Sequence, residues 1–149
     1  MNLLTPITVA DARRAVGSLL PASHASDDEF VTFAYARAVW STLVEPGDGA
    51  AGAFVAAFGP VRALMLAAED GDTIAIAELT GLTPHDVARA RARWRPRLGG
   101  STAAIASAVR FGVSLLTPDD ARWPSRLDDL GVHAPLCLWV RGDPATIGS

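Results

Sequence analysis

The chain has 149 residues, half of them apolar, and a mean hydropathy of +0.24, so it is long and apolar enough for one folded domain and is not disordered as a whole. A formal net charge of −3 excludes a global positive field that would attract nucleic acid or anionic lipid, so any such binding needs a local patch. All 13 basic residues are arginine, and without lysine the chain cannot form the lysine-containing phosphate loop of nucleotide-binding proteins.

Cys137 is the single cysteine, so we expect no disulfide and no thiolate metal cluster, and a small buried side chain at this position. The three histidines lack ligand-like spacing, and we therefore predict no metal and no other cofactor. Residues 1–14 show neither a charged leader nor a continuous apolar run, and no stretch of about 18 uncharged apolar residues occurs anywhere. With an Ala-, Gly- and Arg-rich composition typical of GC-rich genomes, these features predict a protein of the bacterial cytoplasm.

Residues 1–29 predict an N-terminal extension with one short helix, for which Thr8 is a suitable N-cap, followed by a Pro-, Ser- and Asp-rich linker. We expect this extension to be weakly attached. From residue 30 the pattern is clearer. Apolar residues at helical spacing predict a helix to residue 44, and acids at its start suit the helix dipole.

Short helices with Gly or Pro at nearly every joint follow up to residue 112. Gly59 and Gly81 are placed to end two of them, and Pro60 is placed to begin another. Thr83 followed by Pro84 and Asp86 predicts the capped start of a helix that Pro96 limits. Residues 30–112 therefore predict a compact, mainly α-helical domain.

The pattern changes in residues 113–149. Two short apolar runs, 113–116 and 136–140, predict strands, and a short amphipathic helix with Trp123, Leu127 and Leu130 on one face is expected between them. This order predicts the opening β-α-β fragment of an α/β domain. Two short strands cannot complete a parallel sheet, so we expect them to pair only with each other or with a partner, and this tail to dock on the helical domain or stay mobile.

The joint at Gly81 and Thr83 fits the loose form of a helix-hairpin-helix. In DNA-binding hairpins of this type, backbone N–H groups at the turn contact a phosphate. Such hairpins usually have a second glycine, and in this sequence Thr83 stands in its place. Arg89, Arg93 and Arg97 share one side of the following helix and are candidate phosphate contacts. The alternative interpretation is a tight joint in a helix bundle.

Two further residue sets in this helix leave alternatives open. Arg91 and Arg95 lie on another side of the helix, so the charge is spread around it, and the arginines of this run fit either a solvated face or pairing with the acids at 69–72 and 78. Trp94 could stack a base or lie in the core.

Paired carboxylates occur at Asp119–Asp120 and Asp128–Asp129, but each pair accompanies a short helix, where the dipole favours negative charge. No nucleophile stands beside a general base in the sequence. The sequence therefore predicts no enzyme.

Residues 114–143 contain Trp123–Pro124, then Leu127 on the short helix, then Pro135 before a strand and Gly142 after it. This order resembles the entrance to the Rossmann-like domain of the DprA/Smf family of DNA-processing proteins, in which Tyr-Pro stands where this chain has Trp123–Pro124. Upstream, residues 36–65 resemble the N-terminal helical region of actinobacterial members of the family, a SAM-like domain related to the helix-hairpin-helix. The resemblance implies a SAM-like helical domain over 30–112 and an incomplete Rossmann-like domain from 113.

In full-length members the Rossmann-like domain binds single-stranded DNA, dimerises and recruits RecA in natural transformation and recombination. The family's glycine- and arginine-bearing signature follows the point where this sequence stops, so the resemblance implies an N-terminal fragment. The fragment itself is then expected to be an accessory or protein-interaction module. The alternative hypothesis is a freestanding helix-hairpin-helix DNA-binding protein that contacts phosphates through residues 83–97.

Overall fold

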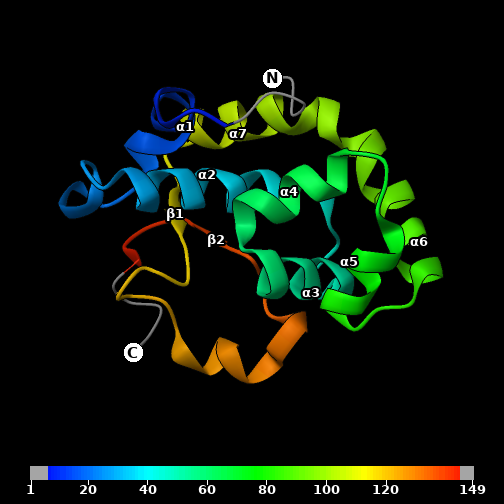
Figure 1. The fold of residues 1–149 in the computed structure, drawn as a ribbon. Helices are drawn as coiled ribbons and strands as arrows, with labels where there is room; N and C mark the ends of the chain where they lie inside the picture. The colour runs from blue at the N-terminus through cyan, green and yellow to red at the C-terminus, as the bar shows by residue number, and fades with distance from the viewer. Residues whose placement is uncertain (1–6, 145–149) are drawn as a thin grey trace.

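The computed structural model describes residues 7–144, which form a mainly helical structure with one two-stranded sheet, as predicted (Figure 1). The α-helices are α1 Val9–Val16, α2 Asp28–Leu43, α3 Gly49–Phe58, α4 Pro60–Ala68, α5 Thr73–Thr80, α6 Pro84–Trp94 and α7 Ser101–Arg110. The strands are β1 Ser114–Leu116 and β2 Leu138–Val140, and the 3-10 segments are η1 Gly17–Leu19, η2 Ala22–His24, η3 Arg95–Gly100 and η4 Ser125–His133.

The described residues contain no single helix with the length and apolar composition of a membrane span, although α3 and α4 reach that composition as a pair bent by 119°.

Helix α2 is the centre of the fold. Figure 1 shows it crossing the middle of the molecule, and α1, α4, α7 and β1 all pack on it. Asp27 caps its start by accepting a hydrogen bond from the Phe30 backbone at 3.1 Å. Buried side chains lie on every side of the helix, including Val31, Ala36 and Val39, each fully buried. A helix that is apolar all round must be surrounded by other elements, which explains this position.

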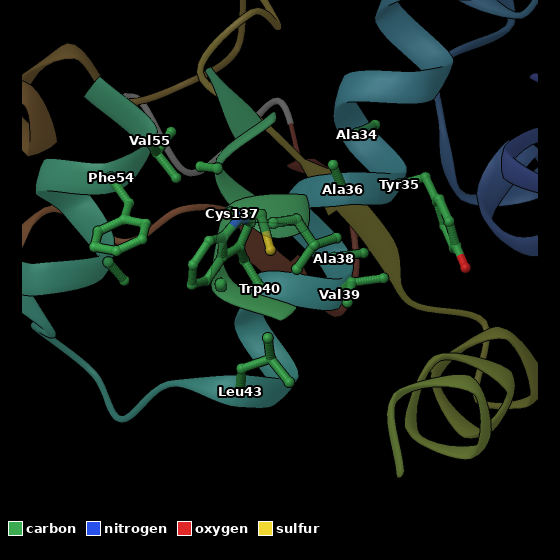
Figure 2. Packing of buried hydrophobic residues seen from close by; sticks show 14 of the residues in the cluster. Ala34, Tyr35, Ala36, Ala38, Val39, Trp40, Leu43, Phe54, Val55 and Cys137 are labelled. Carbon is green, nitrogen blue, oxygen red and sulfur yellow. The ribbon is translucent and has the colours of Figure 1, made fainter. Parts of the chain in front are cut away.

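Three aromatic side chains join α2, α3 and α6 in the core. The ring centroids of Trp40 and Trp94 are 4.9 Å apart, and those of Phe54 and Trp94 are 5.1 Å apart, both in edge-to-face geometry at 88°. Figure 2 shows Trp40 and Phe54 together with the sulfur of Cys137, which lies among the side chains of α2. Trp94 is 1% exposed, so the core interpretation is confirmed and base stacking by this residue is excluded.

The N-terminal segment is part of the core, and the expectation of weak attachment is wrong for the described residues 7–29. Thr8 caps α1 as predicted, accepting from the Asp11 backbone at 3.1 Å. Ala12 and Val16 are fully buried in the same core cluster as α2. The segment attaches because its apolar residues fall on one face of α1, a stripe that must be covered.

The two strands pair with each other in antiparallel register, with Leu115 opposite Trp139. The expected β-α-β fragment, whose strands would run parallel, is therefore corrected to an antiparallel pair within the described residues. The connecting segment η4 is a 3-10 helix interrupted at Gly131, where φ is +58°, so it supplies no continuous α-helix for a crossover.

The strand-bearing tail docks on the helical part through an unusually close approach to α3. A Cβ atom at Gly52 would lie 1.8 Å from the Val132 carbonyl oxygen, and one at Gly49 would lie 2.7 Å from the His133 ring. The His133 Nδ1 lies 2.9 Å from the Gly47 carbonyl oxygen, which accepts its hydrogen. Only glycine on this face of α3 allows η4 to lie so near.

We predict that Gly52→Ala lowers the free energy of unfolding by about 1–3 kcal/mol, because the new methyl group collides with backbone that cannot rotate away. Chemical denaturation followed by circular dichroism measures this. Gly99→Ala is the matched control, since that position opens onto free space. Equal stability of the two variants would contradict the close packing of η4 on α3.

Candidate functional site

The candidate hairpin between α5 and α6 has the predicted caps. Gly81 adopts a left-handed conformation (φ +79°, ψ +4°) and ends α5. Thr83 caps α6 by accepting from the Asp86 backbone at 3.1 Å, and the Thr80 hydroxyl accepts from the Leu82 backbone at 3.3 Å. Two backbone N–H groups of the turn are therefore already bound to hydroxyl groups of the hairpin itself.

Arg91 is buried, 5% exposed, and connects α6 to the α4–α5 corner. Its guanidinium donates to the Leu66 carbonyl at 2.8 and 3.1 Å, to the Gly71 carbonyl at 2.9 Å and to the Thr73 hydroxyl at 3.3 Å. Burial lowers the pKa of this side chain from its usual value, and the neighbouring Arg95 charge acts in the same direction. Arg91 is therefore a structural tie and is unavailable to a phosphate.

Arg95 continues the same connection at the C-terminal end of α6. It donates to Asp70 at 2.6 Å, to the Ala67 carbonyl at 3.2 Å and also to the Glu69 carbonyl. The expected pairing with the acids at 69–72 is thus present for Asp70. No salt bridge with Glu78 occurs in the described part of the chain.

Arg93 and Arg97, both candidate phosphate contacts, are held by acids of the α2–α3 loop. The Arg93 guanidinium is 3.2 Å from Asp48 and lies over the Trp94 ring at 5.9 Å, and that of Arg97 is 2.8 Å from Glu45. Both arginine side chains remain about half exposed.

Arg89 differs from these arginines, because it is exposed and has no ion pair among residues 7–144. It lies with Gly81 and Thr83 in the hairpin and the first two turns of α6, whereas Arg93 and Arg97 lie further along. The three candidate arginines therefore do not form one surface of unpaired cations beside Gly81 and Thr83.

Asp48 is the residue that sequence reasoning missed. Its carboxylate caps α3, accepting from the Ala50 and Ala51 backbones at 3.1 and 3.2 Å, and also accepts from the Trp94 indole at 3.0 Å. With Arg93 as a further donor, this side chain is only 8% exposed. An aspartate directly before an apolar helix can be recognised in a sequence as a helix cap. Its pairing with Arg93 and Trp94, 45 and 46 residues away, cannot be recognised in that way.

The residues that carry the DprA/Smf resemblance gather around the two-stranded sheet. Trp123 is buried against Leu116 and Val140, Leu127 packs on this cluster, and Pro124 precedes η4. Gly142 follows β2 with φ +83°, and Pro135 lies in the approach to that strand. Their positions indicate structural roles for these side chains.

The paired carboxylates have separate surroundings. Asp120 is buried and accepts from the Arg122 backbone at 2.9 Å and from its guanidinium at 2.7 and 3.0 Å. The hydrogen bond from the Arg122 side chain holds the pKa of Asp120 below its usual value. Asp119, Asp128 and Asp129 are exposed, so the pairs do not act as units.

The histidines and the cysteine also lack features of a reactive site. His24 stacks on Phe30 at a centroid distance of 4.2 Å, and His85 is exposed at the start of α6. Burial raises the pKa of the Cys137 thiol to about 12, which keeps it protonated near neutral pH. No group of three metal-ligating side chains is positioned to hold an ion within residues 7–144.

We predict that Asp48→Ala lowers the free energy of unfolding by about 2–4 kcal/mol, because it removes a helix cap and leaves the buried Trp94 indole without an acceptor. Asp48→Asn, which keeps an acceptor oxygen, is expected to lose less. Asp70→Ala breaks an exposed pair and serves as the control, with an expected loss under about 1 kcal/mol. Thermal and urea unfolding measure all three, and similar losses in the two alanine variants would contradict the central role of Asp48.

We predict an acid-dependent contribution from Asp120. Its pKa is lower in the folded state, so it stabilises the fold at neutral pH, and this stabilisation disappears as the pH falls from about 4 through the folded-state pKa. Asp120→Asn should therefore be less stable than the natural chain at pH 7, and the difference should shrink towards pH 2. Asp128→Asn, at an exposed position, should show no such convergence in urea unfolding at each pH.

Comparisons with protein-family models, with characterised proteins and with solved structures give no match to this chain. The DprA/Smf resemblance is therefore a resemblance of residue pattern alone, in 114–143 and in the helical region before it.

Proposed function

We propose that this chain is an accessory, protein-interaction module of a DprA/Smf-type DNA-processing protein in the bacterial cytoplasm. In this proposal, binding of single-stranded DNA and RecA loading belong to the complete Rossmann-like domain. The helical part binds a protein partner and carries out no chemical step.

One observation carries the proposal: the arginines of residues 89–97 mostly stabilise the chain's own fold. Arg91 is buried on backbone carbonyls, and Arg93, Arg95 and Arg97 each pair with a carboxylate. To bind phosphates, the last three would first have to give up those pairs. A DNA-binding surface gains affinity by releasing counterions from phosphates, and arginines already neutralised by acids supply little of that gain.

The family part of the proposal is supported by the way the resembling residues cooperate. Trp123 and Leu127 cover one face of the β1–β2 pair, and Gly142 ends β2 in a left-handed conformation. The residues that resemble the family thus form one structural unit around the strand pair. Further strands of a Rossmann-like domain would have the free edges of this pair available for hydrogen bonding.

A second candidate function is phosphate binding by a helix-hairpin-helix. It is favoured by Arg89, which is exposed and unpaired in the described chain and lies in the same hairpin as Gly81 and Thr83. A helix N-terminus beside a free arginine is a suitable environment for one phosphate group. A site for one phosphate group makes far fewer contacts than a full DNA interface.

Binding of a labelled oligo-dT strand and of an equally long duplex, at about 50 and about 200 mM salt, separates the two candidates. We expect that neither the single strand nor the duplex binds at either salt concentration. Salt-sensitive binding that is lost in Arg89→Ala, and kept in the exposed control Arg62→Ala, would overturn the proposal and favour the hairpin.

Arg93→Ala and Arg97→Ala are informative only beside an unfolding measurement. Both substitutions break ion pairs with the α2–α3 loop, so a loss of DNA binding in these variants could reflect a loosened fold. If the natural chain does bind DNA, loss in Arg93→Ala with unchanged thermal stability would place α6 in the contact.

A further inference from the structure

An open groove lies between α7 and the sheet, and we refer to it as the α7–sheet groove. It has a volume of about 460 Å³. Residues of α2, α7 and β2, together with residues just before β1 and just after β2, line it: Ser41, Thr42, Ala104, Ser107, Ala108, Phe111, Val113, Trp139 and Arg141.

Phe111 makes this groove unusual. Its side chain is 68% exposed, which is the highest value among the large apolar residues in the described chain. It follows the last turn of α7 and forms one wall of the groove, while Trp139 of β2 contributes another. An aromatic side chain left in water beside a hollow is typical of a surface that a partner covers.

Three polar side chains in the walls, those of Ser41, Thr42 and Trp139, already form hydrogen bonds within the chain. The Trp139 indole donates to the Ser41 hydroxyl at 3.1 Å, and that hydroxyl donates to the Ala38 carbonyl at 2.6 Å. The Thr42 hydroxyl donates to the Val39 carbonyl at 2.6 Å and contacts the Ser101 hydroxyl. An occupant therefore gains little from hydrogen bonds to these three side chains, and the walls beside them offer mainly apolar contact.

Arg141 is the one charged residue in the lining. It directly follows β2, is exposed and forms no salt bridge within residues 7–144. Arg93, Arg95 and Arg97 each have a carboxylate partner, whereas the Arg141 guanidinium lies at the edge of an apolar groove without one in the described part of the chain. A guanidinium binds a carboxylate through two parallel hydrogen bonds, which sets the charge of the occupant.

We propose that the α7–sheet groove binds a short segment of a partner protein that carries a bulky apolar side chain next to a carboxylate. The apolar side chain packs between Phe111 and Trp139, and the carboxylate pairs with Arg141. The inference rests on the interaction role proposed above and names the chemistry of the partner.

A second copy of the chain is the competing occupant, because Glu78–Leu79 and Asp129–Leu130 are exposed pairs of this chemistry. Such a contact would join two different surfaces. Contacts of that type form rings or open chains of copies unless both surfaces meet reciprocally about a two-fold axis. A partner segment has no such requirement, and for that reason we favour it.

The probe is a fluorescein-labelled peptide with Asp-Phe-Leu-Glu at its centre and Gly-Ser flanks, titrated with the full chain and followed by anisotropy. We expect saturable binding that Phe111→Ser and Arg141→Glu each weaken about tenfold or more. A peptide with Lys in place of both acids should bind Arg141→Glu better than it binds the natural chain. Leu130→Ser and Arg62→Glu alter exposed residues outside the groove and should leave binding unchanged.

Thermal unfolding of each variant checks that the fold persists. Binding that is unchanged in Phe111→Ser, or that does not depend on the acids of the peptide, would overturn the proposal. The absence of peptide binding to the folded chain would also overturn it. So would a molar mass that increases with protein concentration in light scattering and no longer increases in Phe111→Ser, because that result would identify a second copy as the occupant. None of these results depends on DNA, so the DNA titration tests the proposed function separately.

Discussion

The carboxylate of Asp48 is the interaction on which much of the helical part depends. It begins α3, accepts the Trp94 indole and pairs with Arg93, so one side chain fixes the loop after α2 against α6. The aromatic cluster beside it packs edge to face, and the orientation of Trp94 there follows from having an acceptor for its N–H. A nearly buried carboxylate is tolerated because all of its strong interactions are with donors on the chain.

The arginines of α6 and the first turn of η3 illustrate how a basic run can be internal. A sequence with five arginines at alternate positions suggests a cationic surface, yet four of these arginines fasten two other segments of the fold. Arg91 and Arg95 hold the α4–α5 corner, while Arg93 and Arg97 hold the α2–α3 loop. Alternate positions fall on different sides of a helix, so the run reaches neighbours on both flanks. The net effect is a helix whose charge is largely neutralised by the fold around it.

Local features were predictable from the sequence, and long-range ones were not. Thr83, Gly81 and Pro60 mark helix ends through backbone preferences that act within a few residues, and the structure has those ends. The burial of Arg91 and the hub at Asp48 depend on partners 18 to 46 residues away, which periodicity does not reveal. The antiparallel strand pair was missed for a related reason: strand direction depends on where the connecting segment lies, and η4 is held by glycines of α3.

The position of α2 has a consequence for how the chain folds during synthesis. Its Arg37 donates to the carbonyl of Leu136, 99 residues later, and its Ser41 accepts from Trp139, 98 residues later. An all-round apolar helix is therefore completed by residues that are made 98 and 99 positions after their partners in it. Until those residues emerge from the ribosome, part of α2 stays uncovered, which gives nascent chains a long interval of exposed apolar surface. Shielding by a chaperone during that interval would matter more here than for a bundle whose contacts are local.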